Sequence, residues 1–226
     1  MRTGCMRTFK FPLIIAAIAA VSLGTAACGS DDSSSSSSNA STGQTKPVAD
    51  VGSLTGRSTA VTLDAGFVDA LKQLKLTPSP LGDASISANG VASFPITGGN
   101  VKYFKPGSVS PFVQGEIDHA GSGLQLKGGG KTVQLTDFVV DPGASVLTGK
   151  VTVDGKEAAA SAPLFFLDGR TLKPLEAKDN GTAVLEGTTV KFKDESAQLL
   201  NETFGVDALK GGLVVGVATI TVNTGA

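Results

Sequence analysis

The sequence has few of the residues that crosslink a chain or carry out chemistry. Its 226 residues include two cysteines, one histidine and one tyrosine, and no tryptophan. Cys5 lies in an N-terminal segment that we expect to be removed, and Cys28 directly follows that segment. A disulfide in the folded part is therefore excluded, and stability must come from an apolar core. The composition predicts a core of aliphatic residues and phenylalanine.

The scarcity of histidine and cysteine also argues against catalysis. His119 would need a serine nucleophile for a Ser-His-Asp triad, and the sequence contains no Gly-x-Ser-x-Gly turn. Sequence motifs for zinc, calcium and phosphate sites are absent as well. We therefore expect a protein without enzymatic activity. A hydrolase that uses paired carboxylates remains an alternative, with Glu116, Asp118 and Asp137 on predicted strands as candidates.

Positive charge is not in excess either. The chain has 19 lysines and arginines against 20 acidic residues, and the N-terminal segment contains three of the basic residues and none of the acidic ones. Its loss would leave a net charge of −4. Such a balance argues against nucleic acid or an anionic membrane surface as a partner.

The first 27 residues have the three parts of a bacterial lipoprotein signal peptide. The basic residues at its start are Arg2, Arg7 and Lys10. An uncharged apolar stretch, Phe11 to Leu23, and the small residues of 25–27 follow. Cys28 then stands where lipoprotein processing attaches its acyl chains, palmitate among them, which hold a protein on a membrane. The alternative is an ordinary secretory signal peptide with a chance cysteine, since Thr25 replaces the usual leucine.

The sequence divides into three parts. Residues 1–27 are the predicted signal peptide, 28–57 the lipid anchor and a disordered linker, and 58–226 a single β-sandwich domain. The linker contains an unbroken serine run from Ser33 to Ser38, and such a composition cannot bury enough apolar area to fold. We expect the domain to sit on the extracytoplasmic face of the cell membrane, held there through the lipid.

The domain reads as strands separated by turns about 8–12 residues apart. Asn89-Gly90 and Asp154-Gly155 predict type I′ hairpins, in which both central residues need a positive φ. Gly128 to Gly130 separates two further apolar-alternating segments. The pattern predicts an all-β fold, an antiparallel β-sandwich or barrel-like sheet.

Two short helices interrupt the strands. The first is predicted from Asp64, its N-cap, to about Lys75. The second runs from Asp194 to about Phe204 and ends at Gly205. Each follows a short strand, which indicates either a weak internal repeat or chance similarity of two amphipathic segments.

The candidate ligand-binding residues are His119 and Tyr103, the one histidine and the one tyrosine. His119 precedes a glycine turn between two predicted strands, and Tyr103 lies upstream. Together they could bind and tune a haem iron. The alternative is that His119 is a polar turn residue and Tyr103 a half-buried strand aromatic.

The chain also resembles the HtaA-type domain of actinobacterial surface proteins, over roughly residues 60–222. The segments that carry the resemblance are Val61 to Phe67, Phe94-Pro95-Ile96, Gly115-x-Ile117-x-His119-x-Gly121 and Thr136 to Asp141. The resemblance implies a β-rich fold with a few helices and haem uptake at the cell envelope. It also implies that His119 is the histidine that partners a tyrosine iron ligand. The segment from Phe67 to Leu76, where the family has that tyrosine, contains none.

These observations predict a lipid-anchored extracytoplasmic binding module. Its candidate ligands are haem or another small molecule, bound around residues 103–123. The alternative is a non-catalytic envelope or adhesion-type surface lipoprotein with a protein partner, which would show an exposed apolar patch or an unpaired edge strand.

Overall fold

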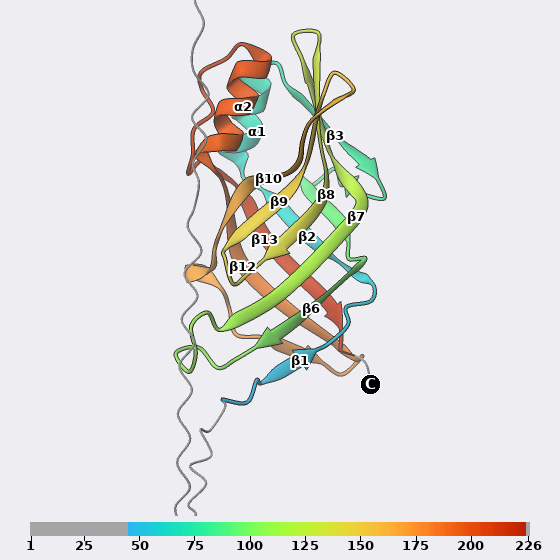
Figure 1. Ribbon diagram of the computed structural model, residues 1–226, viewed down its shortest axis with the longest axis vertical. Helices are drawn as coiled ribbons and strands as arrows, with labels where there is room; N and C mark the ends of the chain where they lie inside the picture. The colour runs from blue at the N-terminus through green and yellow to red at the C-terminus, as the bar shows by residue number, and fades with distance from the viewer. Residues whose placement is uncertain (1–44, 225–226) are drawn as a thin grey trace, which may run out of the picture. The chain divides into compact units, whose positions relative to one another are not determined.

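The computed structural model describes residues 45–224, which form one 13-stranded sheet and two α-helices (Figure 1). The helices are α1 (Ala65–Gln73) and α2 (Asp194–Phe204), and the 3-10 helix η1 spans Gly169–Thr171. The strands are β1 (Ala49–Val51), β2 (Arg57–Leu63), β3 (Thr77–Gly82), β4 (Ser85–Ile86), β5 (Val91–Pro95), β6 (Gly98–Tyr103), β7 (Val113–Gly128), β8 (Lys131–Asp141), β9 (Val146–Val153), β10 (Lys156–Asp168), β11 (Glu176–Lys178), β12 (Thr182–Phe192) and β13 (Val214–Asn223).

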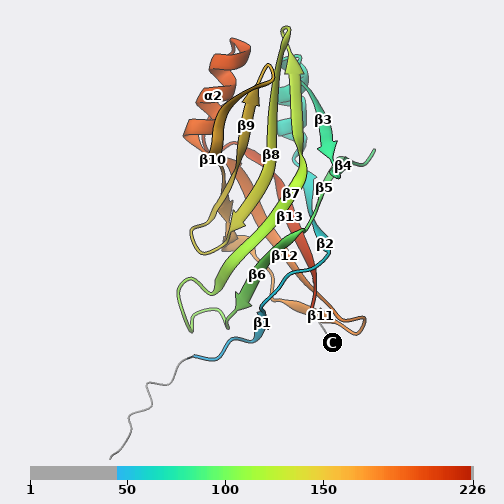
Figure 2. The same cartoon turned by 45° about the vertical axis from the view of Figure 1, so that its right-hand side comes forward.

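The sheet is antiparallel and curls into a half-barrel (Figures 1 and 2). Its strand order is β1-β6-β7-β8-β9-β10-β12-β13-β2-β5-β4, with β3 beside β7 and β11 beside β12. The prediction of an all-β fold with two short helices is therefore confirmed. Of the two architectures considered, the domain adopts the barrel-like one, because a single sheet bends around its own concave face.

One short connection accounts for the curl. The strands β5 and β6 stand near opposite ends of the strand order, yet only Ile96 and Thr97 connect them. The two ends of the sheet must therefore meet at this corner. The Ile96 N–H donates to the Arg57 carbonyl oxygen at 2.8 Å, and the Thr97 N–H donates to that of Asp118 at 2.9 Å. These bonds tie the corner to β2 on one side and β7 on the other.

The long strand β7 changes partner halfway along its length. Its first half pairs with β6 and its second half with β3, and a bulge separates His119 from Gly123. Gly121, within the bulge, has φ 73°, and its N–H donates to the Asp137 carboxylate at 2.9 Å. At Gly123 a Cβ would lie 2.2 Å from the Leu135 carbonyl oxygen, so only glycine lets β8 approach so closely there.

Both helices cover the same end of the half-barrel (Figure 1). The Asp64 side chain accepts a hydrogen bond from the Phe67 N–H at 3.2 Å, which confirms the predicted N-cap of α1. Gly205 ends α2 with φ 67°, as predicted. Phe67 packs edge-on against Phe192, with ring centroids 5.8 Å apart, and so joins α1 to the end of β12.

The predicted hairpins are present, with one difference in turn type. Asp154 and Gly155 have φ of 49° and 79°, as a type I′ turn requires. At Asn89-Gly90 only Gly90 has a positive φ, 74°. The turn there is wider, since the Ser87 N–H donates to the Val91 carbonyl oxygen.

Folded structure begins earlier in the chain than the predicted boundary at residue 58. The strand β1 pairs with β6, with Val51 opposite Val101. Leu54 is 1% exposed, and its N–H donates to the Gly99 carbonyl oxygen at 2.9 Å. Residues 49–56 therefore belong to the domain. The predicted signal peptide, Cys28 and the serine run lie outside the described residues. Within 45–224, neither helix has the length and apolar character needed to span a bilayer.

Candidate functional site: an apolar cavity on the concave face

The concave face of the sheet encloses a cavity of about 350 Å³. Alternating residues of several strands, among them β2, β6 and β13, point into it, as the period of two in a β-strand dictates. In β13, for example, Ala218, Ile220 and Val222 line the cavity, while Val217 is exposed on the outer face. Both described helices lie at one end of the half-barrel (Figure 2).

The lining is almost entirely apolar. None of the described residues that line the cavity is aspartate, glutamate, lysine or arginine. The lining residues with a polar side chain are Thr59, Tyr103, Ser110, His119, Ser145 and Thr188. A cavity of this volume is at the small end of the range for small-molecule sites, roughly 300–1,000 Å³.

His119 lies on the inner face of β7 with 1% of its surface exposed. Its Nδ1 is 2.9 Å from the Pro95 carbonyl oxygen, and its Nε2 is 3.2 Å from the Thr59 hydroxyl. A carbonyl oxygen can only accept, so Nδ1 carries the proton and Nε2 accepts from Thr59. Burial lowers the pKa of His119, which keeps the imidazole neutral. His119 is therefore neither a turn residue nor exposed.

The two hydrogen bonds of His119 make it a cross-link between strands. Its own strand, β7, lies in one arm of the curled sheet, whereas Pro95 and Thr59 belong to β5 and β2 in the other. Nearby, the Ala120 N–H donates to the Thr97 hydroxyl at 2.9 Å. His119 and Thr97 thus hold β7 against the β5–β6 corner, where the sheet closes on itself.

Tyr103 lines the same cavity but at a different level. It is 6% exposed and packs edge-on against Phe112, with ring centroids 6.0 Å apart. The register of β6 and β7 places Tyr103 opposite Val113, six residues along the strand from His119. At about 3.3 Å per residue their backbone positions are separated by roughly 20 Å along the strand. They share a cavity, but they cannot both contact one iron atom.

The candidate carboxylates lie outside the cavity. Glu116 and Asp118 are two residues apart on the face of β7 opposite to His119, and Asp137 bonds to the bulge at Gly121. Among residues 45–224, no three histidine, cysteine or acidic side chains gather closely enough to hold a metal ion. None of these three carboxylates lines the cavity.

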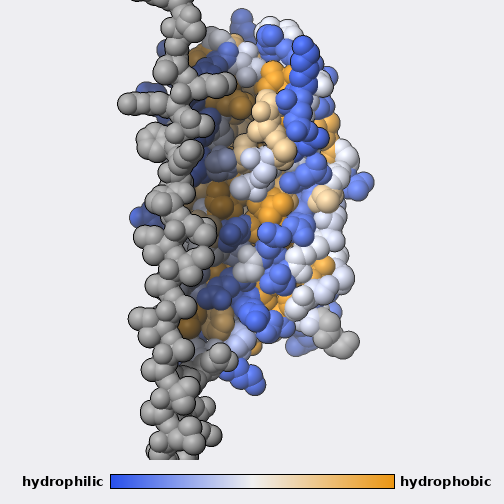
Figure 3. Space-filling view, in the orientation of Figure 1, coloured by the Kyte–Doolittle hydropathy of each residue, from blue (hydrophilic) through white to orange (hydrophobic). Residues whose placement is uncertain are grey.

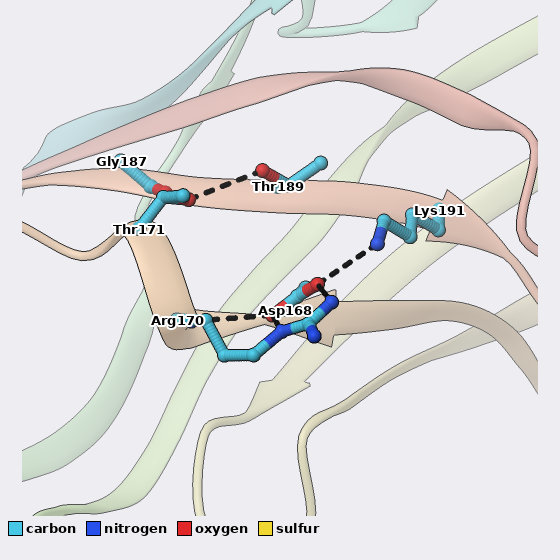
Figure 4. A network of polar contacts seen from close by, with 6 residues as sticks. All are labelled: Asp168, Arg170, Thr171, Gly187, Thr189 and Lys191. Carbon is cyan, nitrogen blue, oxygen red and sulfur yellow. Dashed lines mark hydrogen bonds and ion pairs between the residues drawn. The ribbon is translucent and has the colours of Figure 1, made fainter.

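Sequence reasoning missed a polar cluster where β10 meets β12 (Figure 4). Asp168 accepts hydrogen bonds from Arg170 Nε at 2.9 Å, Arg170 Nη2 at 2.6 Å and Lys191 Nζ at 2.8 Å. These two cations, Arg170 foremost, hold the pKa of the Asp168 carboxyl well below its ordinary value. Lys191 is 23 residues away in the chain, so no local pattern could have indicated the cluster.

Few large hydrophobic side chains are exposed among the described residues. The large hydrophobic side chains exposed in the described region are Val48, Phe166 and Val217. On the face shown in Figure 3, hydrophobic and hydrophilic residues are interspersed. Two short strands, β1 and β4, end the strand order, and β3 contains Pro78 and Pro80, which lack the N–H that another strand would need.

The described fold, a curled antiparallel half-barrel with two helices at one end, resembles a domain of known structure. A crystal structure of the C-terminal domain of HtaA from Corynebacterium glutamicum matches with a TM-score of 0.55 and 13% identity, over 76% of this chain and 99% of that one. A domain-swapped dimer of a histidine-to-alanine variant of that domain matches with a TM-score of 0.44 and 12% identity, over 71% and 92%. No known family profile and no curated protein matches the sequence. The resemblance seen in the sequence is confirmed as a likeness of fold.

Proposed function

We propose that this protein is a non-catalytic binding module that takes an apolar small molecule into the cavity of its half-barrel. The observation that carries the proposal is the lining itself, which is continuous, concave and uncharged among the described residues. Soluble domains bury such surface unless a ligand uses it, because exposing it to water costs about 25 cal/mol per Å². A likeness to HtaA at this level of identity supports the fold only. The ligand therefore has to be inferred from the residues that line the cavity.

We also propose that the module is held on the extracytoplasmic face of the cell membrane by acyl chains on Cys28. The support is the signal peptide pattern of residues 1–27 and the serine-rich linker that follows Cys28. Mass spectrometry of the protein from its native membrane tests this directly, since the N-terminal peptide should begin at Cys28 and carry acyl chains. Substitution of Cys28→Ser should release the protein into the soluble fraction. An unacylated wild-type chain would contradict the anchor.

Haem, the ligand implied by the sequence resemblance, does not fit the residues present. The cavity offers iron one nitrogen, His119 Nε2, which already accepts from Thr59. Tyr103 is too distant to act with it, and the segment from Phe67 to Leu76, where the family has a tyrosine, contains none. No cationic side chain among the described lining residues could pair with haem propionates. An uncharged apolar molecule suits this lining better.

Binding can be tested with N-phenyl-1-naphthylamine, a neutral dye that fluoresces in apolar surroundings. Residues 28–226 with Cys28→Ser should give a saturable fluorescence increase. Ala218→Phe fills the cavity from β13 and should abolish it, whereas Thr219→Phe, the next residue on the outer face, should leave it unchanged. Circular dichroism should show that both variants fold. A wild-type domain that does not bind the dye would overturn the proposed function.

A further inference from the structure

Polar groups that are deep in the cavity already have partners. Thr59 and His119 hydrogen-bond to each other, and His119 also bonds to the Pro95 carbonyl oxygen. Across the described region, no fully buried side-chain nitrogen or oxygen lacks a partner. A site for a polar ligand has unpaired hydrogen-bonding groups that converge on the position of the ligand. Apart from Thr188 on β12, the remaining residues that line the deep part of this cavity are apolar, so it suits a hydrocarbon chain.

Accessible hydroxyl groups gather at the end of the cavity remote from the helices. Tyr103 ends β6, Ser110 lies in the β6–β7 connection, and Ser145 lies in the β8–β9 connection. The two connections touch, because a Cβ at Gly143 would lie 3.6 Å from the Pro111 ring. No described residue hydrogen-bonds to these three hydroxyls. They are therefore free to bind a polar group of the ligand.

The two segments that contain Ser110 and Ser145 carry one charge of each sign. The β6–β7 connection contains one charged residue, Lys105, and the segment 141–145 also contains one, Asp141. An anionic head would find no excess of cations here, and burying it unpaired in the cavity would be costly. An alcohol or ester, by contrast, needs only the hydroxyl groups that are present.

We infer that the cavity binds a neutral long-chain lipid, with its hydrocarbon chain toward His119 and its alcohol or ester group at Tyr103, Ser110 and Ser145. This inference rests on the proposed function and narrows it from apolar molecules in general to one class of lipid. On this basis the domain is a module whose half-barrel binds lipid and not haem. The apolar chain provides affinity in proportion to its buried area, and the hydroxyls set its direction.

Displacement of bound N-phenyl-1-naphthylamine tests the inference with two ligands that have the same acyl chain and differ in the charge of the head group. Monolaurin has a neutral head, and laurate is anionic at neutral pH. Monolaurin should displace the dye from residues 28–226 with Cys28→Ser at concentrations at least about tenfold below those of laurate, since an unpaired buried charge is penalised. Haemin, measured in parallel, should give no Soret shift.

Variants at the end of the cavity that carries the three hydroxyl groups provide a second test. Tyr103→Phe should weaken monolaurin binding roughly fivefold, the value of one neutral hydrogen bond, with dye affinity measured in parallel. Thr219→Phe should change neither. If the dye binds but monolaurin does not displace it, or if laurate binds better, the lipid inference is wrong and the proposed function stands. If haemin binds better, the lipid inference and the exclusion of haem are both wrong. If the dye itself fails to bind, the proposed function fails first.

Discussion

At the scale of single residues, His119 decides how the sheet closes. Its ring joins β7 to Thr59, 60 residues earlier in the chain, and to the carbonyl group of Pro95. Because burial disfavours the charged form of the ring, its protonation and the stability of the fold are linked. A charged ring would have to reverse the bond with Thr59, with Nε2 donating, and remain buried beside Phe94.

We therefore expect the free energy of unfolding to fall as the pH decreases below about 6.5, the pKa of histidine in an unfolded chain. Burial lowers the pKa of His119 in the folded state, so the unfolded chain binds the proton first. Stability from this group is complete above the unfolded pKa and declines until the folded pKa is reached. Urea unfolding between pH 8 and pH 5 should show this decline, and His119→Gln should remove it. An unchanged slope in His119→Gln would contradict the role assigned to the ring.

At the scale of elements, each helix begins or ends on a residue that the local sequence supplies. Asp64 caps α1 by accepting from the Phe67 N–H, and Gly205 ends α2 in the left-handed region. The junction of β10 with β12 is different, since it has four paired positions and the Asp168 cluster beside it. There, charged side chains from distant segments reinforce a short strand pair.

Removing the cap of α1 by Asp64→Ala should lower the free energy of unfolding by about 1 kcal/mol, the usual cost of losing an N-cap side chain. Asp69→Ala on the same helix is the matched control. Asp69 pairs only with the exposed Lys72, and such surface pairs contribute little. Chemical unfolding of both variants should separate them. If both variants lost the same free energy of unfolding, the charge on the helix, and not the cap, would account for the loss.

Replacing the Asp168 carboxylate by Asp168→Asn should destabilise the protein near pH 7. Arg170 and Lys191 hold its folded pKa below the unfolded value of about 3.9, so the carboxylate stabilises the fold above that pH and loses its effect as the pH falls. The difference between wild type and variant should therefore narrow below about pH 4. Glu176→Gln, at an exposed pair with Lys178, should have little effect at either pH. A difference that persists in acid would point to packing instead of charge.

At the scale of the whole molecule, the domain is a sheet closed around an interior that its core only partly fills. The helices and the phenylalanine cluster of Phe67, Phe165 and Phe192 fill one end, and the cavity occupies the rest. The N-terminal residues 49–56 complete the wall, with Ala49 and Val51 in the lining and Leu54 buried. The domain is thus larger than the part that starts at residue 58.

Truncating Leu54→Ala should lower the free energy of unfolding by about 2–5 kcal/mol, as for other buried leucines. Val48→Ala is the control, because Val48 is 66% exposed and its loss should cost less than about 0.5 kcal/mol. Thermal or urea unfolding measures both. If Leu54→Ala were as stable as wild type, the segment before residue 57 would not be part of the folded unit.

The sequence by itself determined the features that depend on neighbouring residues. The cap at Asp64, the end of α2 at Gly205 and the tight turn at Asp154-Gly155 follow from backbone preferences within a few positions. Only the tertiary structure decided which strands meet, because strand pairing depends on contacts far apart in the chain. It placed Thr59 against His119, moved Tyr103 roughly 20 Å from it along the strand, and enclosed the cavity between strands that no local pattern relates.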